Sequence, residues 1–112
     1  MSAPRLNRRL TLESPERLAD NHGGFTESWT PIGVLWAEVT PRTGRETTSV
    51  GAPVSRVGYR IVVRGAPVGH PERPMVEQRF RDGARLFLLH SVTEVDAAGR
   101  YLVCFADEEI AA

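Results

Sequence analysis

The side chains that could do chemistry in this chain of 112 residues are scattered, and none of them forms a catalytic pattern. The single cysteine, Cys104, lies in RYLVCFAD among apolar neighbours, which is typical of a buried and unreactive thiol. The histidines His22, His70 and His90 lack the spacing of metal ligands. No nucleophile elbow, phosphate-binding loop or dinucleotide fingerprint occurs. We therefore expect no catalytic residue, no metal site, no cofactor and no enzymatic activity.

Arginine is the most informative residue type. All 14 basic residues are arginine and 14 residues are acidic, so the formal net charge is +0 and the chain as a whole is not a typical polyanion binder. Residues an even number apart share one face of a strand, which groups Arg56, Arg60 and Arg64 in one segment and Arg79 and Arg81 in the next. Each group is either a solvated face with salt bridges inside the chain, or a surface for phosphate or a carboxylate-bearing partner.

Strand patterns dominate the segments that carry these residues. RRLTLES alternates apolar and polar residues, and VLWAEV, RVGYRIVVR and YLVCFADEE are further strand candidates. VEQRFRDGARLFLLHSV predicts a hairpin that turns at Asp82-Gly83. Proline and glycine favour long loops at about 15–32, 41–53 and 65–75, with one helical turn possible near 45–49. The prediction is one all-β domain over residues 1–112, a small antiparallel β-barrel of about six strands with at most one short helix.

Several of these strands are apolar on both faces. The runs are Val34-Leu35-Trp36-Ala37, Ile61-Val62-Val63, Leu86-Phe87-Leu88-Leu89 and Leu102-Val103-Cys104-Phe105. A small barrel buries only its inner face, so part of the outer face needs a cover. Because the chain has little helix to supply one, we expect neighbouring copies to do so. Trp29, Leu89 and Phe105 are candidate contacts between subunits, although Trp29 and Trp36 are equally compatible with an ordinary core.

A membrane partner is not expected. No apolar run approaches the ~20 residues of a membrane span. The segment MSAPRLNRRL is basic but lacks the apolar stretch of a secretion signal, which favours a cytoplasmic protein.

The order of motifs resembles the phage head–tail joining family, the head-closure or stopper proteins of tailed phages and gene transfer agents. The motifs are LNRRLTLESPE, DNHGGFTESWTPIGVLWAEVTPRTGRE, YRIVVR, RFRDGARLFLLHSV and GRYLVCFADE, which together run from about Leu6 to Glu108. After Gly-Arg-Glu many family members continue into an amphipathic helix. Here Thr47-Thr48-Ser49-Val50-Gly51-Ala52-Pro53 favours an extended loop instead.

The resemblance implies a structural protein that forms a homo-oligomeric ring of six-fold or twelve-fold symmetry in the neck of a particle. Portal and adaptor proteins would lie above the ring and tail proteins below it. Packaged double-stranded DNA would pass through the channel without sequence-specific contacts. The protein would be cytoplasmic during assembly and would then reside in the neck of the phage or phage-like particle.

The resemblance also implies that the loop between the second and third strands faces the channel. In that place Arg42 and Arg45 would meet phosphate and Glu46 would pair with an arginine of the adjacent subunit, and the alternative is a solvent-exposed connection that makes no contacts. Trp36 would be mainly core. The alternatives are another connector component, either an adaptor, whose family is mostly helical, or a tail-terminator-like protein. A small β-barrel that binds nucleic acid or a ligand is the alternative from another class.

Overall fold

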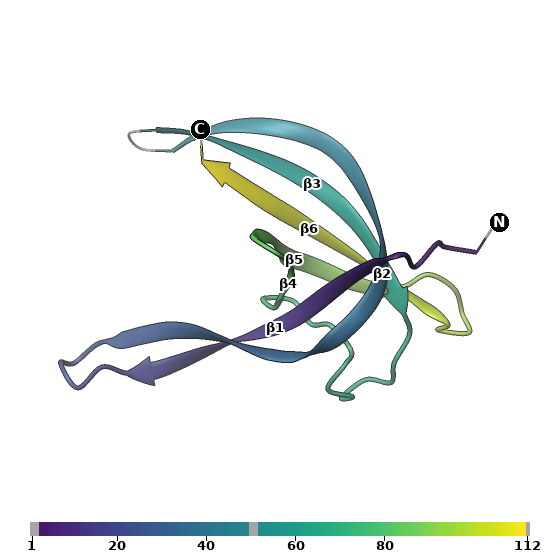
Figure 1. The fold of residues 1–112 in the computed structure, drawn as a ribbon, viewed down its shortest axis with the longest axis horizontal. Coiled ribbons are helices and arrows are strands. Elements are labelled where there is room, and N and C mark those ends of the chain that lie inside the picture. The colour runs from purple at the N-terminus through teal and green to yellow at the C-terminus, as the bar shows by residue number, and fades with distance from the viewer. Residues whose placement is uncertain (1–2, 50–51, 112) are drawn as a thin grey trace.

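The computed structural model describes the backbone of residues 3–49 and 52–111, and the side chains of residues 3–42 and 57–108. Within these residues the chain is built from strands without helix, so the prediction of an all-β fold with six strands is confirmed. No helix in this described part is long and apolar enough to cross a membrane. The strands are β1 (Arg8–Ala19), β2 (Phe25–Ser49), β3 (Ala52–Arg64), β4 (Arg79–Asp82), β5 (Arg85–Glu94) and β6 (Tyr101–Ala111) (Figure 1).

The strands form a closed barrel in the order β1-β2-β3-β6-β5-β4, and every neighbouring pair is antiparallel. The closure is short, because β4 meets β1 only from Thr11↔Arg81 to Glu13↔Arg79. The β4–β5 hairpin turns through Gly83 and Ala84, since Asp82 pairs with Arg85. Gly83 has φ +63°, a conformation that glycine adopts without a steric penalty, so the turn predicted at Asp82-Gly83 is confirmed.

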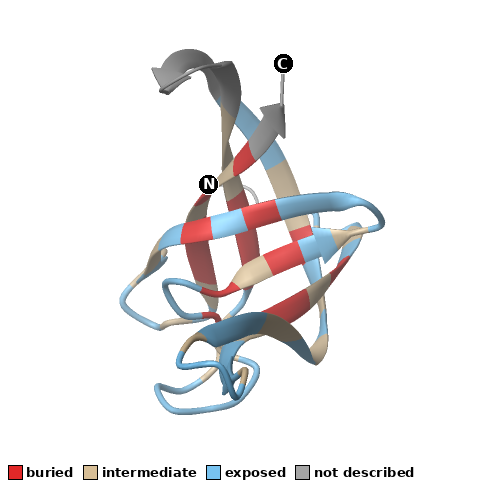
Figure 2. Ribbon diagram, turned by 90° about the vertical axis from the view of Figure 1, so that its left-hand side faces the viewer, coloured by how far each residue is buried: buried red, intermediate tan, exposed pale blue. Residues whose placement is uncertain are grey.

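The core fills the barrel with alternate residues of each strand, as a period of two requires. Figure 2 shows this alternation as buried segments separated by exposed ones along the strands. No member of the core is more than 2% exposed. The members are Leu10, Leu12, Ala37, Ile61, Val63, Phe80, Phe87, Leu89, Leu102, Cys104 and Ala106.

The register decides which residue of each two-faced apolar run points outward. Leu89 is 1% exposed and belongs to the core, whereas its neighbour Leu88 is 44% exposed. The expectation that Leu89 contacts another subunit is therefore wrong, because β5 turns it inward together with Phe87. In β6, Cys104 points inward and Phe105 lies on the opposite, partly exposed face.

Trp36 differs from its expected place in the core, because 54% of it is exposed. Its neighbours Leu35 and Ala37 face the barrel interior, so the alternation of β2 puts Trp36 on the outside. Trp29 is half-buried, farther along the same strand.

Strands replace most of two predicted loops. The pairing of β1 with β2 continues from Glu13↔Pro31 to Ala19↔Phe25, so residues 15–32 form a two-stranded ribbon around a short turn. The pairing of β2 with β3 continues to Ser49↔Ala52, so most of 41–53 is a hairpin. Proline favours a loop at 15–32 in the sequence, but Pro15 lies within β1 and Pro31 within β2. Each strand of a ribbon has a free edge, where a missing N–H is tolerated. Residues 65–78 between β3 and β4 form no strand, and these residues include the loop expected at 65–75.

The turn of the β1–β2 ribbon is built around Asp20. Its Oδ1 accepts the backbone N–H groups of His22 at 2.8 Å and of Gly24 at 3.0 Å. Asn21 and Gly23 adopt φ values of 65° and 83°, which asparagine and glycine tolerate best. The Asp-Asn and Gly-Gly pairs of the sequence thus make a tight turn rather than a long loop.

Cys104 should react slowly in the native protein. Burial raises the pKa of its thiol to about 12, and the thiolate is the reactive species. We expect slow labelling by a thiol reagent under native conditions and fast labelling in denaturant, followed by mass spectrometry. Rapid labelling of the native protein would contradict the placement of β6 in the core.

Candidate interaction surfaces

A buried carboxylate, Glu13, holds two arginines on the outside of the barrel. Glu13 follows an irregularity in β1 and stands opposite Arg79 of β4. Its Oε1 accepts a hydrogen bond from Nε of Arg79 at 2.7 Å, and its Oε2 lies 3.1 Å from Nε of Arg81. Since Glu13 is only 2% exposed, water cannot take the place of either guanidinium.

Trp29 joins this group through Arg79. The Arg79 guanidinium lies 4.0 Å from the centroid of the Trp29 ring, a cation–π contact. Trp29 stands opposite Pro15 at the base of the β1–β2 ribbon. The Glu13 cluster (Glu13, Trp29, Arg79 and Arg81) therefore ties the base of the ribbon to β4, and Trp29 acts here as a contact within the chain.

For Arg79 and Arg81 the sequence left open a salt-bridged face or a surface for a partner. The two residues share one face of β4, opposite the buried Phe80, as expected. Both pair with Glu13 of the same chain, so the structure favours the salt-bridged alternative. The Arg81 side chain is 46% exposed, whereas that of Arg79 is 19% exposed, so only Arg81 presents much guanidinium to solvent.

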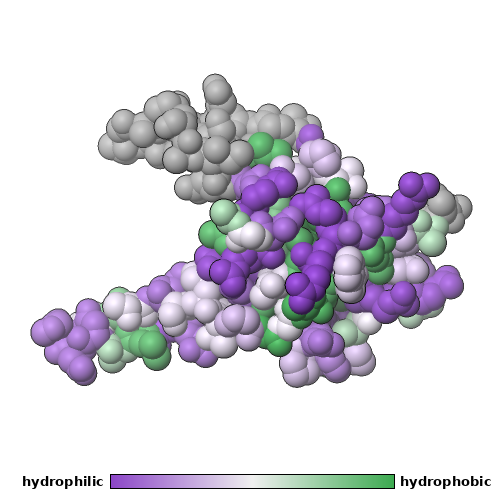
Figure 3. Space-filling view, in the orientation of Figure 1, coloured by the Kyte–Doolittle hydropathy of each residue, from purple (hydrophilic) through white to green (hydrophobic). Residues whose placement is uncertain are grey.

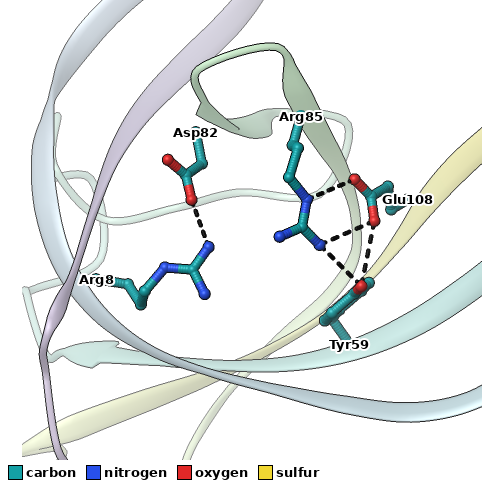
Figure 4. A network of polar contacts seen from close by, with 5 residues as sticks. All are labelled: Arg8, Tyr59, Asp82, Arg85 and Glu108. Carbon is teal, nitrogen blue, oxygen red and sulfur yellow. Dashed lines mark hydrogen bonds and ion pairs between the residues drawn. The ribbon is translucent and has the colours of Figure 1, made fainter.

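A second network closes one end of the barrel (Figure 4). Arg85 donates to both oxygens of Glu108, from Nε at 2.8 Å and from Nη2 at 3.0 Å. The hydroxyl of Tyr59 donates to Glu108 Oε1 at 3.1 Å. The Tyr59 ring packs edge-on against the Phe87 ring, with centroids 5.0 Å apart. Because Glu108 continues the inward face of β6, the apolar interior ends in a charged plug.

This network shifts three pKa values. Hydrogen bonds from Arg85 hold the pKa of Glu108 below its usual 4.5, against the opposing effect of burial. The hydrogen bond with Glu108 raises the pKa of Arg85. Burial, and then the hydrogen bond with Glu108, raise the pKa of Tyr59. Beside the plug, Arg8 of β1 forms an ion pair with Asp82 at the end of β4.

The predicted arginine face of β3 is only partly described. Arg60 is half-buried and Arg64 is exposed, whereas the side chain of Arg56 lies outside the described residues. In the backbone register, Arg56 pairs with Glu109 and Arg60 with Phe105. The role of this face toward phosphate or a partner stays a prediction.

The predicted channel-facing segment lies in the β2–β3 hairpin. Arg42 is exposed, and its guanidinium lies 4.6 Å from the centroid of the Phe105 ring. The side chains of Arg45 and Glu46 lie outside the described residues, although the backbone of Arg45 pairs with that of Arg56. The sequence predicts different surfaces for Arg42 and Phe105, and the structure brings these two side chains together.

The sequence did not identify which apolar side chains face water. Val34 is 41%, Trp36 54%, Leu86 39% and Leu88 44% exposed, and all four lie on the outer side of the barrel. In the register, Val34 pairs with Thr11, Thr11 with Arg81, and Arg81 with Leu86, so a mixed apolar and basic row crosses four strands. Among the described residues, no group of three or more His, Cys, Asp or Glu side chains could hold a metal ion.

Residues 1–109 match the family of phage head completion proteins. The chain belongs to this family. It is similar to a chain in the virion of a native gene transfer agent particle, at 49% identity and a TM-score of 0.89, over 98% of this chain and 100% of the other. The resemblance recognised in the sequence is thereby confirmed.

A more distant solved structure shares the fold of this head completion protein. Protein SF1141 from Shigella flexneri 2a is 20% identical with a TM-score of 0.65, and the similarity covers 96% of each chain. No curated protein matches the sequence. At this identity the Shigella protein supports the fold alone.

Removing Glu13 should destabilise the protein strongly. In Glu13→Ala the half-enclosed Arg79 loses its anion, and breaking a buried pair costs about 3 kcal/mol. The matched control is Arg8→Ala, which breaks a pair whose side chains are 38% and 35% exposed and which should cost less than ~1 kcal/mol. Urea unfolding measures both, and equal losses would contradict the assigned importance of Glu13.

The charged plug should make stability depend on pH. Because the folded-state pKa of Glu108 is depressed, its contribution is fully present above the unfolded value of 4.5 and is lost as pH falls through the folded value. The difference in melting temperature between the wild type and Glu108→Gln should therefore narrow as the pH is lowered from neutral to below 4.5. A difference that stays constant over this range would show that the carboxylate charge contributes nothing.

Proposed function

We propose that this protein is a head-closure, or stopper, subunit that joins the DNA-filled head of a phage-like particle to its tail. The observation that carries the proposal is the 49% identity, over 98% of this chain, with a chain of a gene transfer agent virion. The similarity runs over nearly the whole chain and over all of the other chain. The proposed assembly is a homo-oligomeric ring in the particle neck, with portal and adaptor proteins on one side and tail proteins on the other.

Two features of the fold support a role in assembly. The β1–β2 ribbon extends beyond the barrel as a pair of strands, and the β2–β3 hairpin extends on the other side with β6 paired along β3 as far as Val54↔Ala111. Neither arm is needed to close the sheet, since closure uses only Thr11 to Glu13 of β1. Side chains on such arms are available to proteins above, below and beside the subunit in a ring.

The all-β fold favours the stopper over the adaptor, because the adaptor family is mostly helical. The other alternative, a small barrel that binds nucleic acid by itself, predicts salt-dependent DNA affinity of the isolated chain. A formal net charge of +0 favours the stopper over this alternative, since DNA that passes through the channel of a stopper should be held weakly. In the proposed ring, Arg42 and Arg45 of the β2–β3 hairpin supply the weak phosphate contacts.

Particles assembled without this protein should contain filled or leaking heads that carry no tails. Supplying the wild-type chain should restore tailed particles, counted by electron microscopy together with nuclease-resistant DNA. Tail attachment and DNA retention equal to wild type in its absence would refute the proposed function.

The arginines of the hairpin provide a narrower test. The double variant Arg42→Ala and Arg45→Ala should stay folded, because Arg42 is exposed, while its particles leak DNA or fail to join tails. The matched control is Arg100→Ala, which removes a side chain that is 74% exposed and paired with Asp96 in the β5–β6 turn. If the double variant and the control both retain DNA and tails like wild type, the hairpin arginines play no part in closure.

A further inference from the structure

The end of the β1–β2 ribbon carries an aromatic side chain that is mostly exposed in the described chain. Phe25 is 63% exposed, and the Arg17 guanidinium lies 4.8 Å from the centroid of its ring. Phe25 stands opposite Ala19, and Arg17 stands opposite Glu27, so all four share one face. Figure 3 shows apolar atoms directly behind the hydrophilic turn at the end of the ribbon.

A ribbon of two strands cannot stabilise such a face by itself, since it has no second layer to pack against. The opposite face of the same ribbon carries Leu18, which is 53% exposed and pairs with Thr26. The two faces differ in charge: Arg17 and Glu27 flank Phe25, whereas Glu16 and Ser28 lie on the side of Leu18. A partner whose surface is complementary in charge as well as in apolar area will therefore bind one face of the ribbon in preference to the other.

The barrel offers a groove of matching chemistry. Its volume is about 430 Å³, which is large enough for an aromatic side chain, and its apolar wall includes Val34 and Trp36. Arg64 and Glu72 line the same groove, and neither has an ion-pair partner among the described side chains. The full lining is Leu6, Val34, Leu35, Trp36, Arg64, Gly65, Ala66 and Glu72.

The two surfaces cannot meet within one chain. The ribbon turn and the N-terminal segment, which contributes Leu6 to the groove, lie at opposite ends of the longest axis, which measures 49 Å (Figure 1). A knob at one end and a matching groove at the other make a head-to-tail contact, the kind that closes rings. The charges are complementary, because the ribbon brings Arg17 and Glu27 to a groove that holds Glu72 and Arg64.

We propose that the Phe25 face of each ribbon docks into the Trp36 groove of the next copy of this chain. Arg17 then meets Glu72 of the next copy, and Glu27 meets its Arg64. The inference rests on the proposed function, which supplies the ring, and it names the surfaces through which neighbouring copies meet. It also gives a cover to Trp36, whose exposure the monomer does not explain.

Cysteine pairing tests the contact in assembled particles. Phe25→Cys combined with Val34→Cys puts one thiol on the knob and one in the groove, and the buried Cys104 is a poor competitor. Mild oxidation should give a ladder of covalent oligomers on a non-reducing gel. The single variants Phe25→Cys and Val34→Cys should give no ladder, because each lacks one half of the contact.

Three outcomes would overturn the proposal. One is the absence of a ladder from particles that contain the variant chain and carry tails, which leaves the proposed function intact. Another is dimer formation by a single variant, which indicates a two-fold contact. The third is a crosslink from Phe25→Cys to a different particle protein, which assigns the knob to the portal or tail side. Particles assembled without the chain test only the proposed function, because they contain no contact between copies.

A matched pair of charge variants tests the face independently. Phe25→Asp puts a charge into the contact and should lower the yield of tailed particles at least about tenfold, while the exposed position keeps the monomer folded. Leu18→Asp places the same charge on the opposite face of the same ribbon and should leave the yield near wild type. Equal losses in the two variants would overturn the assignment of the Phe25 face.

Discussion

Only three pairs of residues, from Thr11–Arg81 to Glu13–Arg79, join β4 to β1 and close the sheet. This short pairing closes the sheet into a barrel and so gives every strand an inner and an outer face. Its middle pair, Leu12 and Phe80, points into the core, and its last pair carries the buried charge of Glu13 to the outside. A carboxylate that is 2% exposed is a costly group, and here its two arginines hold the ends of the closure together. Without that closure the apolar inner face would have two open edges.

The closure also explains why the molecule has arms. β2 has 25 residues and β1 has 12, far more than the short barrel can pair on both sides. The excess length continues as the ribbon on one side and the hairpin on the other, each with a free edge. The barrel therefore carries two projecting arms, and the contact proposed for the ring joins one arm, the ribbon, to the outer side of the barrel of the next copy.

Sequence patterns predicted the strands of the barrel because alternation there reflects a single buried face. Asp82-Gly83 predicted its turn because two residues with the right backbone freedom suffice. The inward member of Leu88-Leu89 could not be predicted, since both residues are apolar and the register is set by pairing with β4 and β6. The ribbon was predicted as a loop because proline disfavours a strand inside a sheet, whereas a ribbon with free edges tolerates Pro15 and Pro31. The Glu13 cluster joins residues 66 positions apart, and no local signal announces it.

The buried charged side chains of the barrel are paired within the chain, whereas several at the groove and on the ribbon form no ion pair among the described side chains. Glu13 and Glu108 sit on or in the barrel, and each is held by arginine of the same chain, so these pairs form as the subunit folds. Arg64 and Glu72 lie at the groove with no such partner among the described side chains, and Arg17 and Glu27 lie on the ribbon. Such a subunit can complete its barrel before it meets a neighbour. Folding pairs Glu13 and Glu108 with arginines and leaves the charges of the groove and the ribbon for a partner. The formal net charge of +0 is therefore compatible with one arginine and one glutamate on each of the two surfaces, which suits the head-to-tail contact proposed above.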